Sequence, residues 1–165
     1  VQDRARAEAQ SVLQGRACTG DDVENLPFIR MIIDEALRMY PAAGIISRTA
    51  QKKDTLGGRE ILPGDTVMIP IYALGRHHQL WDDPDAFRPE RFADRKAIDR
   101  YAYLPFGDGP RICIGASFAL QEAVIILATM LSRFKFTPVP GKEPEPVMIL
   151  TLRPDGGVWM TAEPA

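Results

Sequence analysis

A short glycine-rich stretch around one cysteine constrains this chain more than any other feature does. Residues 106–115 read Phe-Gly-Asp-Gly-Pro-Arg-Ile-Cys-Ile-Gly, and an apolar helical pattern follows at residues 116–131. Cys113 therefore lies where a loop enters a helix, and the unpaired N–H groups and positive dipole of a helix start favour a thiolate. The glycines allow the backbone to bend sharply and to approach a flat partner closely. With Arg111 two residues away, the pattern predicts a cysteine that serves as a ligand or as a nucleophile.

The spacing of this stretch resembles the haem-ligating signature of the cytochrome P450 family, Phe-x-x-Gly-x-Arg-x-Cys-x-Gly. The fixed positions of that signature are filled by Phe106, Gly109, Arg111, Cys113 and Gly115. The resemblance implies that Cys113 is the axial thiolate ligand of the iron in haem b, which is iron protoporphyrin IX. It assigns further contacts with this cofactor to Phe106, Gly107, Arg111 and Gly115.

Two other interpretations of Cys113 remain open. A lone cysteine in a tight turn is more often a buried, inert side chain than a ligand. A thiol enzyme with Cys113 as its nucleophile needs a base, and the sequence does not place His77 or His78 near the cysteine. These adjacent histidines point in different directions and lack a third ligand at metal spacing, so a surface pair is the simpler interpretation.

A second motif lies on the apolar helical pattern of residues 28–40, which a proline ends. Glu35 and Arg38 are three residues apart and share a helix face, so an exposed ion pair is one interpretation. Their surroundings match the Glu-x-x-Arg helix of cytochromes P450, and Pro-Glu-Arg-Phe at residues 89–92 resembles the meander motif of that family. The resemblance implies a buried triad of Glu35, Arg38 and Arg91 that holds the cysteine loop behind the haem.

Several other positions take a role from the resemblance alone. Arg48, like Arg111, is implied as a partner of a haem propionate, because a guanidinium matches carboxylate geometry. The alternative for Arg48 is an exposed strand arginine. The family lines its substrate pocket at the positions that match Ala43, Ile45 and Leu150. These small or apolar side chains imply an apolar substrate, and plain packing within β-structure is the alternative.

The remaining patterns predict a mixture of helices and short strands. Apolar periodicity and composition predict helices over residues 2–14, 28–40 and 116–131, the last of them buried. Turn signals and β-branched residues predict a small antiparallel sheet from strands 45–51, 59–62 and 66–72, with a turn at 54–58. A packed meander is expected over residues 73–105. After the last helix we expect a strand at 134–137 and a hairpin that pairs 147–152 with 158–161. The expected fold class is an α+β fragment of the predominantly α-helical cytochrome P450 fold. The resemblance implies that residues 1–165 are the C-terminal part of one such domain, without its N-terminal part and central distal helix.

The composition argues against several classes of protein. The chain has 165 residues, of which 45% are hydrophobic and 25% charged, and its net charge of −2 argues against a nucleic-acid partner. Two cysteines do not form a disulfide framework, which favours a reducing, cytoplasmic location. No signal peptide is visible, and no apolar run reaches the length of a bilayer span, so we expect no membrane segment in this chain.

The resemblance implies a haem-thiolate monooxygenase that inserts one oxygen atom from O2 into a small apolar organic molecule. Its electrons come from a ferredoxin or a flavin reductase, which such enzymes receive on the face behind the cysteine. Candidates for a basic docking patch on that face are Arg76, Arg95, Lys96 and Arg100, and a solvated run of charges is the alternative. We expect the isolated chain to be inactive, because the family's proton-relaying helix has no counterpart in these residues. We also expect it to self-associate, because apolar surface that would face the missing part is left exposed. A non-catalytic haem-binding or interaction domain is the alternative function.

Overall fold

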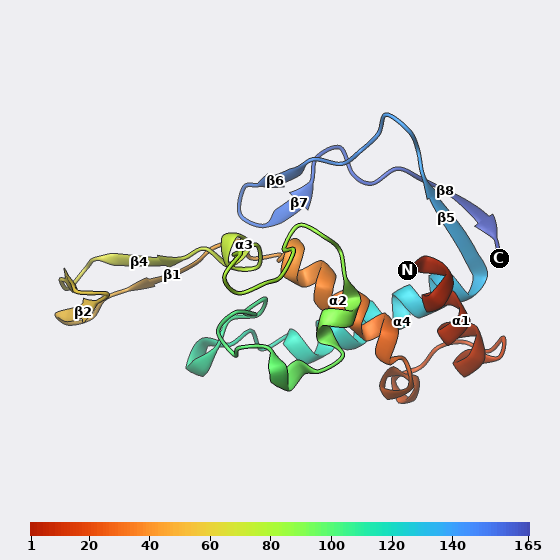
Figure 1. Ribbon diagram of the computed structural model, residues 1–165, viewed down its shortest axis with the longest axis horizontal. Coiled ribbons are helices and arrows are strands. Elements are labelled where there is room, and N and C mark those ends of the chain that lie inside the picture. The colour runs from red at the N-terminus through yellow and green to blue at the C-terminus, as the bar shows by residue number, and fades with distance from the viewer.

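The computed structural model describes every residue from Val1 to Ala165, and its three main helices pack together in the body of an elongated molecule (Figure 1). They are α1 (Gln2–Leu13), α2 (Pro27–Met39) and α4 (Ala116–Arg133). The main hydrophobic core forms where they meet, and Leu13, Ile29 and Val124 are among its buried members. Each of these side chains comes from a different helix, so the core joins segments that are far apart in the sequence.

The local sequence explains where the first helix ends and how the chain turns after it. α1 is rich in strong helix formers, and it stops where Gln14 and Gly15 take left-handed backbone angles, with φ of 48° and 86°. A short 3-10 helix, η1 (Gly20–Asn25), follows. Thr19 caps it, and the backbone N–H and hydroxyl of Thr19 donate to the Asp22 carboxylate at 2.9 and 3.1 Å.

The second helix is capped by a side chain from the first. α2 begins at Pro27, which tolerates the first helical position because it has no N–H to satisfy. The next two amides, of Phe28 and Ile29, donate to the Glu8 carboxylate of α1, each at 2.9 Å. A carboxylate at a helix N-terminus also complements the helix dipole. Glu8 therefore fixes the position of α2 against α1.

The strands form four separate two-stranded antiparallel pairs. β1 (Ile46–Thr49) pairs with β4 (Thr66–Ile69), and β2 (Asp54–Leu56) pairs with β3 (Arg59–Ile61), so these strands make a ribbon that extends away from the helices (Figure 1). The segment predicted as a turn at 54–58 is wrong, because only Gly57 and Gly58 make the turn, with φ of 56° and 78°, and β2 precedes them. The strand predicted over 66–72 ends at Ile69, and the short helix α3 (Ile71–Leu74) follows.

The C-terminal strands pair differently from the prediction. β6 (Pro146–Met148) pairs with β7 (Leu152–Pro154), whereas β8 (Met160–Pro164) pairs with β5 (Phe134–Pro138). The predicted hairpin between 147–152 and 158–161 is therefore wrong. Pro146 and Pro154 lie opposite each other at the end of the β6–β7 ladder, where a residue without an N–H ends the pairing. The following glycines, Gly156 and Gly157, bend the chain towards β8 instead.

The predicted meander is a chain of short helical turns packed around aromatic side chains. It holds the 3-10 helices η2 (Pro89–Phe92) and η3 (Arg95–Ala97), and η4 (Gly109–Arg111) follows in the cysteine loop. Trp81, Phe92 and Ala102 form a second, small buried cluster. The Tyr103 ring meets the Phe92 ring edge-on, with 4.8 Å between the ring centroids. Met31 of α2 packs against this cluster, so the cluster joins the meander to that helix.

Helix α4 is long and apolar, but it is mostly not buried. Only Val124, Ala128 and Leu131 of this helix are buried, whereas 69% of Phe118 and 49% of Ile126 are exposed. The prediction of a buried helix is therefore wrong for most of its surface. By length and composition α4 is also apolar enough to cross a membrane, against the expectation that no run is. A core helix of a globular protein meets the same criterion, so this single helix is weak support for a membrane span.

Candidate functional site

The cysteine loop holds its sulfur outward. Cys113 is exposed and free, so the interpretation as a buried, inert cysteine is wrong. The loop reverses direction at Gly107 and Gly109, with φ of 74° and 73°, angles that side chains rarely adopt. The Cys113 N–H then donates to the Phe106 carbonyl at 2.9 Å, which closes the loop. The backbone therefore fixes the direction of the cysteine while the sulfur itself makes no hydrogen bond.

Exposed apolar side chains flank the cysteine in the sequence. Ile112, Ile114 and Phe118 are all exposed large hydrophobic side chains next to the cysteine in sequence. A Cβ added to Gly107 would lie 3.4 Å from the Ile46 side chain, so strand β1 runs beside the loop.

Two arginines near this loop lack an acidic partner. Arg48 lies two residues after Ile46 in β1 and therefore on the same face of the strand. Its guanidinium donates only to the neighbouring Ser47 carbonyl, at 2.8 Å, and it is exposed. Arg111 is exposed and forms no hydrogen bond or ion pair. The loop thus offers a thiol, an apolar surface and two free cations to a ligand that carries carboxylates.

The structure brings Glu35, Arg38 and Arg91 together. The Arg38 Nε and Nη2 atoms donate to Glu35 Oε2 and Oε1 at 2.7 and 2.9 Å, and both side chains are fully buried. Arg91 comes from η2 and donates from Nε to Glu35 Oε1 at 3.3 Å, with 8% of its side chain exposed. This arrangement is not the exposed pair that helix spacing alone allows. Its forked geometry and burial make it the most strongly constrained polar group of the molecule.

The triad ties the meander to α2 through backbone atoms. Glu35 Oε1 also accepts a hydrogen bond from the Arg88 amide at 2.7 Å. The guanidinium groups of Arg38 and Arg91 donate to carbonyl oxygens of the meander. These acceptors belong to Gly75, Pro84 and Ala86 for Arg38, and to Asp82, Asp83 and Ala86 for Arg91. A loop with little regular structure is thus held by charge-assisted hydrogen bonds.

Of the three predicted pocket residues, Ala43 and Ile45 lie in one segment and Leu150 lies in another. Ala43 is half-buried and Ile45 is exposed, both just before β1. The β6–β7 hairpin reaches this segment, because the Leu152 amide donates to the Ala42 carbonyl at 2.9 Å. Leu150, at the tip of that hairpin, is 91% exposed. Packing within β-structure therefore does not explain Ile45 or Leu150.

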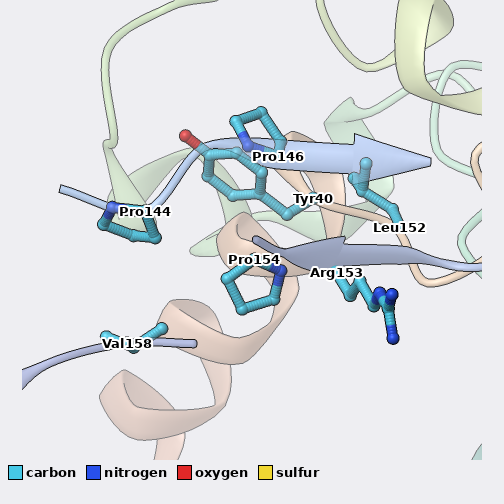
Figure 2. A pocket seen from close by; sticks show the side chains of 7 residues that line it. All are labelled: Tyr40, Pro144, Pro146, Leu152, Arg153, Pro154 and Val158. Atoms are coloured by element: carbon cyan, nitrogen blue, oxygen red, sulfur yellow. The ribbon is translucent and has the colours of Figure 1, made fainter. Parts of the chain in front are cut away.

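A separate cavity of about 390 Å³ lies at the end of α2, under the same hairpin (Figure 2). In the view of Figure 2 the Tyr40 ring lies close to Pro146, and Pro144 and Pro154 also line the cavity. The lining residues are Tyr40, Pro144, Pro146, Leu152, Arg153, Pro154 and Val158. None of the predicted cofactor or pocket residues is among them, so this cavity is distinct from the surface around the cysteine.

Two of the four residues of the predicted basic patch form ion pairs within the chain. Arg95 pairs with the buried Asp34 at 2.6 Å, and Arg100 pairs with Asp108 at 2.8 Å. The hydrogen bond from Arg100 lowers the pKa of the Asp108 carboxyl below its usual range. Arg76 donates to the Met39 carbonyl, and its guanidinium lies 4.0 Å from the centre of the Tyr72 ring. Neither Arg76 nor Lys96 has an acidic partner, so these four residues do not act as one patch of free cations.

The histidines do not support a thiol enzyme. His77 accepts a hydrogen bond from the Gln79 amide through Nδ1, at 3.2 Å, within its own loop. Neither histidine is hydrogen-bonded to Cys113, and a nucleophilic cysteine needs such a base. No three of the His, Cys, Asp and Glu side chains are arranged to hold a metal ion.

The sequence analysis missed Asp34 and Tyr103. The buried Asp34 carboxylate precedes the triad's glutamate and accepts a hydrogen bond from the Tyr103 hydroxyl at 3.0 Å. The two residues are 69 positions apart and belong to no short motif, so sequence spacing holds no signal for their contact.

The chain resembles known proteins along almost its whole length. A family model described as Cytochrome P450 matches residues 1–163. Cytochrome P450 714C3 from Oryza sativa subsp. japonica is 39% identical over 162 residues, which cover 95% of this chain and 32% of that protein. Cyclooctatin synthase from Streptomyces melanosporofaciens is 40% identical over 152 residues, which cover 90% of this chain and 33% of that protein. Leukotriene-B4 omega-hydroxylase 3 from Mus musculus is 38% identical over 169 residues, which cover 99% of this chain and 32% of that protein.

The chain therefore spans about a third of the length of these curated relatives. The cofactor of the matched family is haem, iron protoporphyrin IX. The match covers the triad, the meander and the cysteine loop together. On these grounds the chain belongs to the cytochrome P450 family.

Proposed function

We propose that this chain is the haem-binding, C-terminal part of a haem-thiolate monooxygenase, with Cys113 as the axial iron ligand. The observation that carries the proposal is the outward-facing Cys113 on a loop that two left-handed glycines shape. When bound, haem supplies the iron at which O2 is activated, and a thiolate ligand donates electron density that favours cleavage of the O–O bond.

The residues around Cys113 suit this cofactor. A porphyrin is flat and apolar with two carboxylates at one edge, and the loop offers exposed isoleucines together with Arg48 and Arg111, which have no acidic partner. Arg48 and Arg111 would hold the propionates by charge-assisted hydrogen bonds. Gly107, Gly115 and Phe106 would let the backbone approach the porphyrin face. Glu35, Arg38 and Arg91 would hold the meander in place behind the loop.

For the substrate we propose a small apolar organic molecule. Ala43, Ile45 and Leu150 would line its pocket, and the exposure of Ile45 and Leu150 leaves them free to contact such a molecule. The mouse relative is named as an omega-hydroxylase of leukotriene B4, which is an organic molecule. The electron donor would be a ferredoxin or a flavin reductase, and the location cytoplasmic. A non-catalytic haem-binding domain has no observation in its favour.

The test is a visible spectrum of the reduced carbonyl complex. In the complete polypeptide that contains this chain, we expect a strongly red-shifted carbonyl band, because the sulfur ligand is a thiolate. Cys113→Ser should abolish that band, whereas Cys18→Ser should leave it unchanged, since Cys18 lies beside η1 and far from the loop in sequence. A red-shifted band that persists in the Cys113→Ser protein would refute the assignment.

A further inference from the structure

A second ion network is centred on the buried Asp34, next to the triad, and it includes Tyr103, three residues before the cysteine loop. Asp34 of α2 is buried, and its Oδ2 atom accepts hydrogen bonds from Arg30 Nε at 3.1 Å and from Arg95 Nη1 at 2.6 Å. Its other oxygen, Oδ1, accepts a hydrogen bond from the Tyr103 hydroxyl at 3.0 Å. The same hydroxyl lies 3.1 Å from the backbone carbonyl oxygen of Asp34. Both carboxylate oxygens are therefore occupied, one by cations and one by Tyr103.

The ring and the hydroxyl of Tyr103 both make defined contacts. Its ring packs edge-on against Phe92 at 4.8 Å, and the Arg95 guanidinium lies 5.6 Å from the ring centre. Burial raises the pKa of the Tyr103 hydroxyl far above its usual value, and the Asp34 carboxylate beside it acts in the same direction. The hydroxyl thus remains a neutral donor to Asp34. An aromatic side chain with a paired polar tip and a packed ring has little freedom to move.

Tyr103 stands three residues before the carbonyl that binds the Cys113 amide. The Gly107 N–H donates to the Leu104 carbonyl at 3.0 Å, and the Cys113 N–H donates to the Phe106 carbonyl at 2.9 Å. A short, hydrogen-bonded path therefore leads from the Tyr103 side chain to the cysteine backbone. Because Tyr103 is bonded to Leu104 and lies close to Phe106 in sequence, a displacement of Tyr103 would shift these carbonyl acceptors as well.

We propose that Asp34, acting through Tyr103, is a positioning residue that sets the orientation of the cysteine loop and hence of the Cys113 sulfur. The triad holds the meander around residues 75–91, whereas this network holds its last part, Arg95 to Tyr103, next to the loop. Asp34 and Glu35 are adjacent in α2, so a single helix turn anchors both segments. The inference rests on the proposed role of Cys113 as the haem ligand.

The first test measures hydrogen exchange in the chain without haem. Tyr103→Phe keeps the ring and removes the hydroxyl, so the Cys113 amide should exchange about tenfold faster, the effect of losing one hydrogen bond to a charged group. Core amides of α2 and α4 should keep their rates. The matched control is Tyr101→Phe, because the Tyr101 side chain is exposed and its hydroxyl makes no hydrogen bond. Unchanged exchange at Cys113 in Tyr103→Phe would overturn the inference.

A double-mutant comparison asks whether Asp34 acts through Tyr103. Asp34→Ala should accelerate Cys113 exchange by itself, and it should add little when Tyr103→Phe is already present. Fully additive effects would show that Asp34 acts by another route and would overturn the inference. If Asp34→Ala does not fold, the inference is tested by Tyr103→Phe alone, through the exchange rate of the Cys113 amide and the spectrum of the reduced carbonyl complex.

The second test uses the haem-loaded complete polypeptide. In Tyr103→Phe, the share of reduced carbonyl complex with the red-shifted band should fall and the reduction potential should shift, while Tyr101→Phe should match the unaltered protein. Faster exchange with an unchanged band and potential would overturn the inference, because the sulfur would then be oriented by other contacts. A missing red-shifted band in the unaltered protein would refute the proposed function instead, and the exchange rates would still decide whether Asp34 holds the loop.

Discussion

Arg91 is the single residue on which the meander depends most directly. It joins the buried Glu35 carboxylate to carbonyls of the loop between Asp82 and Ala86, and only 8% of its side chain is exposed. Without Arg91, Glu35 would keep Arg38 but lose one of its two buried cations, and the meander carbonyls would lose their charged donor.

Arg91→Ala should therefore destabilise the chain by about 3–5 kcal/mol, because Glu35 loses a buried partner. Chemical denaturation monitored by tryptophan fluorescence measures this, since Trp81 lies in the adjacent buried cluster. The matched control is Arg88→Ala, whose side chain is half exposed and pairs with Asp82 at 3.4 Å. That substitution should cost less than about 1 kcal/mol. A similarly small cost for Arg91→Ala would mean that the triad contributes little.

A pH-dependent contribution to stability resides in Asp22. Its hydrogen bonds with Arg16, at 2.5 and 2.7 Å, and with Thr19 lower the pKa of the Asp22 carboxyl well below its usual range. A carboxyl with a lowered pKa stabilises the folded state above its unfolded pKa of about 4, and this contribution disappears as the pH falls through the folded value.

Asp22→Asn should therefore reduce stability at neutral pH, and the difference from the unaltered chain should narrow below about pH 4. Denaturation curves recorded between neutral and acidic pH measure it. Asp21→Asn is the control, because Asp21 is exposed and makes no ion pair. A constant difference across the whole range would show that Asp22 acts by shape and not by charge.

At the residue level, the sequence showed the members of short motifs and missed the partners between them. Cys113, Arg111 and the Glu35–Arg38 pair lie in dense local patterns, so spacing alone singles them out. The contacts from Glu8 to α2 and from Asp34 to Tyr103 join positions 20 and 69 residues apart. Such contacts depend on how helices pack, which no local pattern contains.

Among the elements, α2 and the meander are tightly packed where Gly75 contacts the C-terminal part of the helix. Gly75 is buried, and a Cβ added there would overlap the backbone carbonyl of Arg38, which belongs to the rigid helix. The Gly75 carbonyl in turn accepts a hydrogen bond from the Arg38 guanidinium at 2.5 Å.

Gly75→Ala should therefore cost about 1–3 kcal/mol or more, since the backbone must move to admit a methyl group. Gly20→Ala is the matched control, because a Cβ at that position meets only the flexible end of the Gln121 side chain. The control should change the free energy of unfolding by less than about 0.5 kcal/mol. Equal costs at the two sites would mean that α2 yields easily at its C-terminus.

The helices and strands were predictable to different extents. α1, α2 and α4 follow from local periodicity and from Pro27, Gly15 and Pro41 at their ends, and the structure has them close to the predicted residues. The pairing of the C-terminal strands was harder to predict from the sequence. Turn residues occur both between β6 and β7 and after β7, and the β6–β7 ladder ends at Pro146 and Pro154. Burial of α4 was predicted wrongly, since an apolar helix looks the same whether or not a neighbour covers it.

For the whole molecule, the exposed apolar face of α4 favours self-association. Phe118, Ile126 and Met130 lie at intervals of four or eight residues and so form one exposed apolar stripe. The isolated chain should self-associate, because contiguous exposed apolar surface drives association. Sedimentation velocity over a range of concentrations measures it. Ile126→Gln should weaken association and Gln121→Ala should not; a monodisperse monomer at all concentrations would contradict the prediction.

The isolated chain should also show no oxygenase turnover. The family's helix that covers the oxygen-binding side of the haem has no counterpart in these residues, and water reaching that side would let activated oxygen escape. The measurement supplies haem, electrons and O2 and looks for hydroxylated product. Coupled turnover by the monomeric chain would show that these residues suffice.

The ribbon of β1 to β4 has a consequence for proteolysis. It extends away from the helices, and its tip carries the exposed Lys53 and Arg59 on either side of the Gly57–Gly58 turn (Figure 1). An isolated two-stranded ribbon opens readily, so trypsin should cut there first. The nicked chain should nevertheless elute as one particle. α1 and α2 lie on one side of the cut and α4 on the other, and their shared core would hold the two pieces together.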